Sequence, residues 1–151
     1  MDQAKRQRLL ENALSILEDG NRLLAVPMDE FFDGNTDEQS IGVNLPRDKH
    51  IGLAGFRSTF EIIRQRPDVQ AVFIELTEVP YPDDEEDADL WPTASVAFVV
   101  TSASLEEVAK WVSALHPRGI HDGWNLRGEV KPPLESTEMR ADMRPVRVWL
   151  L

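Results

Sequence analysis

The sequence contains no cysteine and no long apolar run, and each absence removes a class of protein. Without cysteine the chain can form no disulfide, Cys-ligated zinc site, iron–sulfur cluster or thiol nucleophile. No apolar stretch approaches the ~18 residues that a membrane-spanning helix needs, and no signal-peptide core is present. Phosphate-binding glycine motifs and the G-x-S-x-G elbow are missing too. We therefore expect a cytoplasmic protein that is not an enzyme of a recognisable class.

Positive charge is missing from two long segments of the chain. Residues 67–109 contain eleven acidic residues and no lysine or arginine, and residues 23–46 contain five acidic residues and again no basic one. The formal net charge of the whole chain is −11. Such a field repels nucleic acid and anionic membranes and attracts a basic protein. We expect a basic protein partner, and neither nucleic acid nor a membrane.

The length and composition indicate a single α+β domain over residues 1–151. A chain of 151 residues, 42% of them hydrophobic, is long enough to bury a substantial core. Apolar spacing and capping patterns predict helices over residues 3–19, 28–32, 52–66 and 104–115. β-Branched and aromatic runs predict strands over residues 23–26, 69–79, 94–101 and 146–151, with a short extended piece at 41–45. The segment 118–143 has no clean period and is expected to be an irregular connection.

Apart from the first helix, the predicted order β-α-β-β-α-β is that of a ferredoxin-like split βαβ fold, a four-stranded sheet with two helices on one face. Strand alternation decides which residues face the helices. The expected set is Val72, Ile74, Leu76, Val96, Phe98, Val100, Val146, Val148 and Leu150. The opposite face is half apolar, so we expect the N-terminal helix or a partner to cover it.

Candidate binding residues lie in and beside the two acidic segments. The residues that we expect to contact a partner are Asp33, Asp37, Glu38, Asp83, Asp84, Glu85, Glu86, Asp87 and Trp91. The run 83–87 is typical of a solvated loop, and its charge suits a basic partner. Trp91 has two interpretations, an anchor for the partner or a lid on the core.

The spacing of Asp33, Asn35 and Asp37 raises the question of a metal site. This D-x-N-x-D pattern begins calcium-binding loops. However, the sixth position of the pattern is Glu38 instead of glycine, and the twelfth is Asn44 instead of glutamate. An acidic turn is the simpler interpretation, and the three histidines are interpreted as surface or capping residues. We assign no metal, no cofactor and no catalytic residue.

Four short segments carry a resemblance to known proteins. They are residues 26–35 (Val-Pro-Met-Asp-Glu-Phe-Phe-Asp-Gly-Asn), 40–45 (Ser-Ile-Gly-Val-Asn-Leu), 66–69 (Arg-Pro-Asp-Val) and the step Trp91-Pro92. Over about residues 24–112 the chain resembles a group of small acidic bacterial proteins, some of which look like immunity proteins of toxin systems. The resemblance implies a cytosolic bacterial protein that binds another protein, and it carries over no catalytic residue.

Charge and resemblance together predict a non-enzymatic, acidic protein-binding module. The leading hypothesis is an immunity-type inhibitor that covers a basic site on a toxin or nuclease. One alternative is a small metal- or ligand-binding enzyme that uses the loop from Asp33 to Asp37. Another is a self-associating regulatory module, a homodimer formed through an open sheet face.

Overall fold

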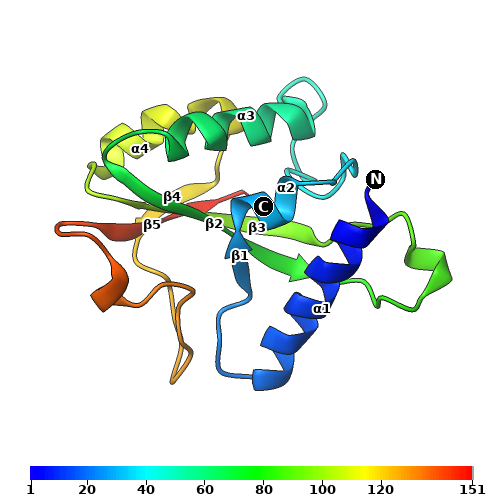
Figure 1. The fold of residues 1–151 in the computed structure, drawn as a ribbon. Helices are drawn as coiled ribbons and strands as arrows, with labels where there is room; N and C mark the ends of the chain where they lie inside the picture. Colours follow the sequence, from blue (N-terminus) through cyan, green and yellow to red (C-terminus); the bar gives the residue numbers. More distant parts are fainter. Residues whose placement is uncertain (151) are drawn as a thin grey trace.

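Five antiparallel strands form one sheet in the computed structural model, which describes residues 1–150 (Figure 1). The strands are β1 (Ala25–Pro27), β2 (Val69–Glu78), β3 (Thr93–Thr101), β4 (Gly119–Asp122) and β5 (Arg144–Trp149), in the order β1-β2-β3-β5-β4. The helices are α1 (Gln3–Asp19), α2 (Met28–Phe32), α3 (Gly52–Arg64) and α4 (Leu105–Trp111). Three 3₁₀ turns are η1 (Glu85–Asp87), η2 (Ser113–Leu115) and η3 (Ser136–Glu138). No helix within residues 1–150 combines the length and apolarity needed to cross a membrane.

The sheet confirms the α+β class, but the ferredoxin-like arrangement is wrong. A βαβ unit joins two parallel strands, whereas β1 lies directly beside β2 in the antiparallel orientation, with Ala25 opposite Glu75. A fifth strand, β4, lies within the segment 118–143 that the sequence predicts to be irregular, and it pairs with β5. The predicted extended piece at 41–45 is a turn instead, closed by a hydrogen bond from the Leu45 amide to the Gly42 carbonyl.

Local sequence determines the ends of the helices. The Asp2 carboxylate accepts a hydrogen bond from the Lys5 amide (3.1 Å) where α1 begins, and Gly20 ends this helix with a φ of 68°. The Ser104 hydroxyl accepts from the Glu107 amide (3.2 Å) at the start of α4, as the sequence predicts. The predicted helix boundaries agree with the structure to within about two residues, except that α4 ends at Trp111 and the rest of the predicted range 104–115 contains the 3₁₀ turn η2.

The helices α3 and α4 lie side by side on one face of the sheet, as predicted (Figure 1). Phe56 and Phe60 of α3 and Val108 of α4 are fully buried there, in one apolar cluster with the inward residues of β2 and β5. The residues of α1 that contribute to the same cluster are Leu9, Ala13 and Ile16. All nine strand residues that the sequence assigns to the core are buried.

The predicted facing of β3 is wrong although its burial is right. Val96, Phe98 and Val100 belong to a second cluster on the face opposite the helices. Pairing explains this arrangement, because directly opposed residues share a face and Val72 of the helix side lies opposite Val99. Every residue from 94 to 101 is buried, so alternation of polar and apolar residues carries no signal in this strand.

The face opposite the helices is covered by the irregular segment 123–143 and not by α1, which corrects that expectation. The indole of Trp124 lies against Phe73 and Phe98, with ring centroids 6.0 and 4.9 Å apart, respectively. Leu134 and Met139 of the same segment pack on this second cluster. The long connection is therefore a second layer of the fold, and the sheet face needed for the self-association alternative is occupied.

One carboxylate, Glu75, shares the covered face with Phe73. Burial raises the pKa of the Glu75 carboxyl above its ordinary value of 4.5, and the charge of Arg147 and a hydrogen bond from Ser95 offset part of this rise. The folded protein therefore holds this proton more tightly than the unfolded chain does. The stabilisation from protonated Glu75 is fully present below the unfolded pKa and is lost as the pH rises through the raised folded pKa.

Replacing the ionisable group tests this linkage. We expect Glu75→Gln to have a larger free energy of unfolding than the wild type near pH ~7, because the buried charge is gone. The difference should shrink as the pH falls to ~4, where Glu75 is protonated in the folded state as well. Urea unfolding at both pH values measures it, with the exposed Glu129→Gln as the matched control. An equal gain at both pH values would contradict the linkage.

The central position of Phe98 makes it a test of the two-layer core. We expect Phe98→Ala to reduce the free energy of unfolding by about 3–5 kcal/mol, because it leaves a cavity under Trp124. Ile62→Ala, at a side chain that is 67% exposed, should change it by no more than ~0.5 kcal/mol. Chemical denaturation of both variants gives the comparison. A loss below ~1 kcal/mol for Phe98→Ala would mean that the segment 123–143 does not seal this face.

Candidate functional site

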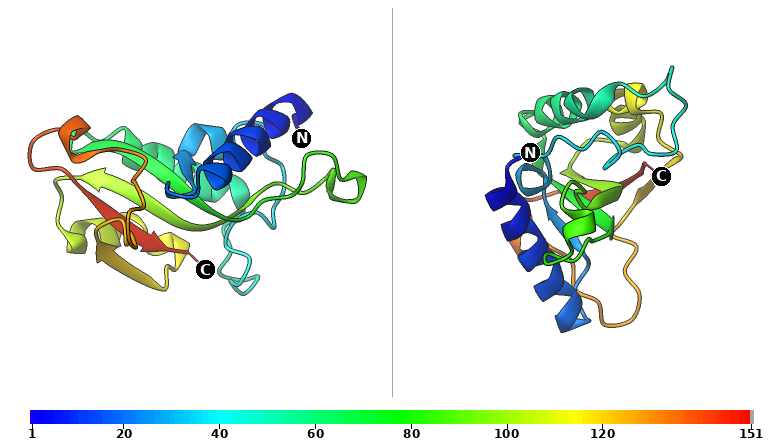
Figure 2. Two further views of the ribbon diagram at one scale, coloured as in Figure 1. Left: turned by 90° about the horizontal axis from the view of Figure 1, so that it is seen from below. Right: turned by 90° about the vertical axis from the view of Figure 1, so that its right-hand side faces the viewer.

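The acidic run predicted to bind a partner lies on a loop that projects beyond the end of the sheet (Figure 2, left). This hairpin loop, residues 79–92, joins β2 to β3. Asp83, Asp84, Glu85 and Glu86 are exposed on it, and Asp87 is half-buried. The Asp84 carboxylate accepts from the Glu86 amide (3.0 Å) and begins the turn η1, so the charges are held on an ordered turn.

A nearly buried arginine of α1 holds the return limb of the hairpin loop. Arg6 is 3% exposed, and its guanidinium donates to the carbonyl oxygens of Leu90 (2.8 Å) and Asp87 (2.7 Å). The Gln3 amide group also donates to the Ala88 carbonyl (3.2 Å). Sequence reasoning missed this role. The available signal was that Arg6 occupies the apolar stripe of its helix, three residues before the buried Leu9.

A cleft of about 690 Å³ lies between the hairpin loop and the turn at 37–44. Its lining residues are Asp37, Gln39, Val43, Asn44, Thr77, Glu78, Val79, Pro80, Tyr81, Asp87, Leu90, Trp91 and Thr93. Val43, Tyr81 and Leu90 are 43%, 71% and 47% exposed. Asp37 of the first acidic segment and Glu78 and Asp87 of the second line this cleft. We call it the hairpin cleft; its volume is within the range of ligand-binding clefts.

Trp91 forms part of the wall of the hairpin cleft and is itself 2% exposed. Its backbone amide donates to the Asp37 carboxylate (3.1 Å), which ties the two sides of the cleft together. Its indole Nε1 is buried and has no hydrogen-bond partner in the described part of the chain. Trp91 is thus a core residue, as one of its two interpretations states, with one polar atom left unsatisfied.

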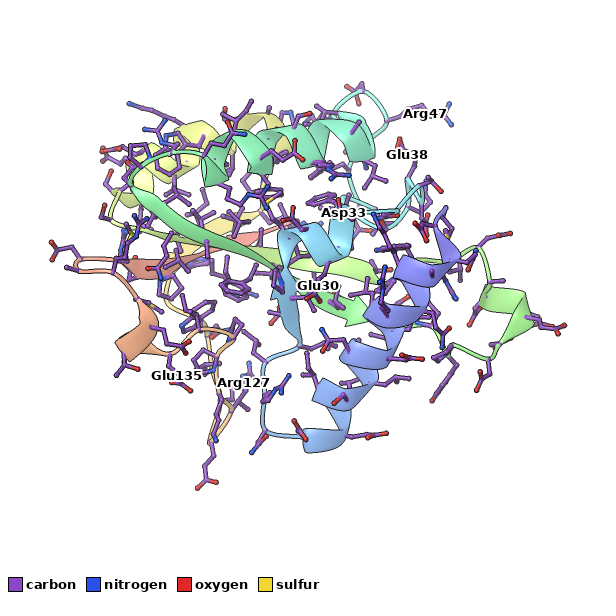
Figure 3. The ribbon with its side chains drawn as sticks, viewed as in Figure 1. Glu30, Asp33, Glu38, Arg47, Arg127 and Glu135 are labelled. Atoms are coloured by element: carbon purple, nitrogen blue, oxygen red, sulfur yellow. The ribbon has the colours of Figure 1, made fainter. Side chains whose placement is uncertain are left out.

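Acids of the first segment have partners within the chain; Asp33 and Glu38 are labelled in Figure 3. Asp33 pairs with Arg57 of α3, and Glu38 accepts from the Leu53 amide (2.9 Å) where α3 begins. The Asp37 carboxylate also accepts from the Gln39 amide (3.0 Å). Asp33, Asp37 and Glu38 therefore support the local structure, whereas the run 83–86 is left for solvent or a partner. The hydrogen bond to Glu61, followed by the pairing with Asp33, raises the pKa of Arg57, which remains charged.

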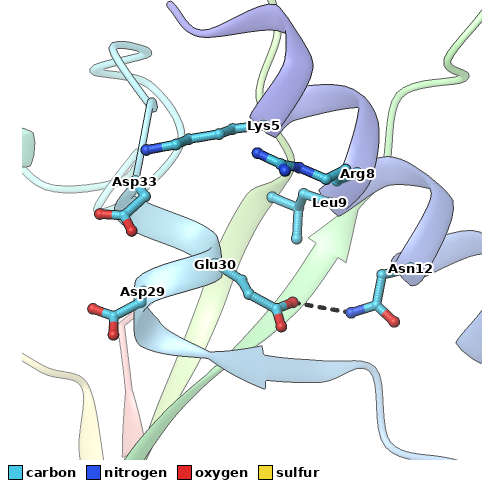
Figure 4. A pocket seen from close by; sticks show the side chains of 7 residues that line it. All are labelled: Lys5, Arg8, Leu9, Asn12, Asp29, Glu30 and Asp33. Carbon is cyan, nitrogen blue, oxygen red and sulfur yellow. Dashed lines mark hydrogen bonds between the residues drawn. The ribbon is translucent and has the colours of Figure 1, made fainter.

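A second pocket of about 420 Å³ separates α1 from α2 (Figure 4). Lys5 and Arg8 extend from α1 toward α2, and Glu30 accepts from the Asn12 side chain (3.0 Å). Asp29, also on this wall, pairs with Arg64 of α3 at 2.7 Å. Within residues 1–150 no three His, Asp or Glu side chains converge in a way that would hold a metal ion. The pocket is of mixed charge, and its carboxylates do not point at one cation.

His50 bridges a loop and a helix start, which is the capping role expected of a histidine here. Its Nδ1 accepts from the Gly52 amide (2.9 Å), so the proton lies on Nε2, which donates to the Ile41 carbonyl (2.8 Å). The ring also packs against Phe56, with centroids 5.3 Å apart. His50 therefore fixes the turn that forms one side of the hairpin cleft.

The Arg6 contacts predict a measurable effect on the hairpin loop. Arg6→Met keeps the apolar stem but leaves two carbonyls without donors, so we expect unfolding to become easier by ~1–3 kcal/mol. A protease that cleaves after acidic residues should cut the loop faster in this variant. Arg8→Met, at an exposed position two residues further along α1, is the matched control and should change neither property. Equal cleavage rates in the wild type and Arg6→Met would show that the tether does not order the loop.

Comparison with known proteins identifies the family. The chain belongs to the Uncharacterized protein YfbO family, whose profile matches residues 4–148. It is 29% identical over 126 residues to "Uncharacterized protein YfbO" of Escherichia coli (strain K12), covering 81% of this chain and 79% of the relative. No solved structure matches. The resemblance to small bacterial proteins is thereby confirmed over more of the chain than the residues 24–112 that carried it.

Proposed function

We propose that this member of the YfbO family is a non-enzymatic, acidic binding protein of the immunity type, which works in the cytoplasm and covers a basic site on a toxin or nuclease. The observation that carries the proposal is the ordered, projecting acidic turn beside the hairpin cleft. Four exposed carboxylates in succession, at residues 83–86, make no ion pair within residues 1–150. Their charge is therefore available to a partner.

Electrostatic complementarity explains why such a turn favours a basic partner. A nuclease or nucleotide-handling toxin needs a positive site to bind phosphates. Clustered carboxylates on the inhibitor raise the association rate and fix the orientation of the encounter. Like charges placed side by side repel one another, so apart from the Asp84 cap of η1 these exposed carboxylates do not favour folding. Their arrangement on a turn held by Arg6 thus favours a role in recognition.

The two alternative functions receive less support from the geometry. The loop from Asp33 to Asp37 is occupied by contacts to Arg57, Gln39 and Trp91, so its oxygens are already engaged. Self-association through the sheet would require the segment 123–143 to leave Phe98. We retain the immunity-type proposal as the one that the acidic turn favours.

Neutralising the acidic turn tests the proposal. The variant carries Asp83→Asn, Asp84→Asn, Glu85→Gln, Glu86→Gln and Asp87→Asn. We expect its melting temperature to be unchanged or higher, because repulsion is relieved and Asn still caps η1. Association with the basic protein that co-purifies from the native host should be at least ~tenfold slower at low salt and much less sensitive to salt.

The control applies the same charge change to five exposed acids outside the two acidic segments. These are Glu11, Glu18, Asp48, Glu129 and Asp142. We expect this control to keep most of the association rate. A clearly lower melting temperature of the turn variant would make the turn structural. Capture of no basic protein, or association that is insensitive to salt, would overturn the proposal.

A further inference from the structure

We infer that the hairpin cleft is the slot for one bulky apolar side chain of a protein partner, carried on a segment in which lysine or arginine flanks that side chain. The inference deepens the proposed function, on which it rests for the basic character of the partner. It adds what the acidic turn alone does not specify, namely an apolar anchor and the place where it inserts.

The first support is the distribution of exposed apolar side chains. Seven large apolar residues stand out as exposed among residues 1–150, and three of them, Val43, Tyr81 and Leu90, line this cleft. They come from the turn at 37–44 and from both limbs of the hairpin loop. Single exposed apolar residues need no explanation, but convergence on one concave surface is typical of binding sites. An apolar side chain placed between them would remove all three from water.

The second support is the unsatisfied indole of Trp91. A buried N–H without an acceptor costs about 1–3 kcal/mol, so each instance calls for a cause. Trp91 is one of the residues that line the cleft, and its buried Nε1 has no partner within residues 1–150. A peptide segment entering the cleft brings backbone carbonyls beside its inserted side chain. An occupied cleft would therefore change the surroundings of this tryptophan, which lines it.

The third support is charge, which also selects the class of occupant. Glu78 and Asp87 are carboxylates of the cleft lining, and the exposed run 83–86 lies on the same loop. Lysine or arginine beside the apolar anchor would meet these charges. A second copy of this chain, with a net charge of −11, would bring the same acids and be repelled. Nucleic acid would be repelled for the same reason.

The cleft is also built before any partner arrives. Arg6 fixes the carbonyls of Asp87 and Leu90, and the Asp37 carboxylate holds the amide of Trp91. Both walls are therefore tied to the body of the protein. Because the cleft is preformed, binding costs less conformational entropy, and this favours selective binding of one side chain.

The experiment uses short amidated peptides and the indole signals of the full chain. The probes are a Lys-Phe-Lys peptide with glycine spacers, the matching Lys-Ala-Lys peptide, and the matching Glu-Phe-Glu peptide. Four tryptophans give four indole N–H signals in a nitrogen–proton correlation spectrum, and Trp91→Phe assigns the one from Trp91. We expect Lys-Phe-Lys to shift this signal most strongly, with affinity about tenfold lower in Leu90→Ser and in Val43→Ser. Leu126→Ser, at an exposed leucine outside the cleft, is the matched control.

The possible outcomes distinguish the apolar binding slot from a purely electrostatic role of the acidic turn. Equal affinities for Lys-Phe-Lys and Lys-Ala-Lys, or no shift of the Trp91 signal, would overturn the apolar slot while leaving a purely electrostatic role for the acidic turn. Equal binding of Glu-Phe-Glu would overturn the flanking charges and weaken the proposed function with them. Should Leu126→Ser weaken binding as much as Leu90→Ser, the cleft is not the site. Loss of binding in the neutralised turn variant alone would support the proposed function without the slot.

Discussion

The strand β3 is buried on both faces, and the need to cover both of them organises the rest of the molecule. One face is sealed by α3 and α4, which form the larger apolar cluster with the inward residues of β2 and β5. The other face has no helix, so Trp124 and its irregular neighbours provide the cover. Once both layers are in place, the hairpin between β2 and β3 emerges from a strand pair of which β3 is buried on both faces. The acidic loop thus starts from a fixed base.

The sequence predicted the elements better than it predicted how they associate. Caps such as Asp2 and Ser104 mark helix starts locally, so the helices were found close to their true bounds. The partner strands of β1 and β4 depend on contacts between distant segments, and no local pattern encodes them. The facing of β3 failed for another reason. A strand that is apolar throughout carries no alternation, and only its register with β2 decides which side of the sheet Phe98 occupies.

The candidate site shows the same division between composition and contact. Both acidic segments are evident from the sequence, but their carboxylates have different partners in the structure. Glu38 accepts a hydrogen bond from the amide at the start of α3, and Asp33 forms an ion pair with Arg57. The acids on η1 form no ion pair within residues 1–150. Arg6 was overlooked because a basic residue on an N-terminal helix is ordinarily a surface residue. The apolar walls of the hairpin cleft come from segments about forty residues apart, so only the fold brings Val43 to Leu90.

The tether between α1 and the hairpin loop has a consequence for how this family can change over time. Arg6 donates its hydrogen bonds to two backbone carbonyl oxygens, a group that every amino acid has. These hydrogen bonds do not involve the side chains of the turn. Substitutions at the exposed positions 83, 85 and 86 therefore leave both these contacts and the Asp84 cap of η1 intact. The conformation of the loop and its binding specificity can therefore change independently. Members of the family can acquire different side chains on the turn, one substitution at a time, while the backbone conformation of the loop is kept.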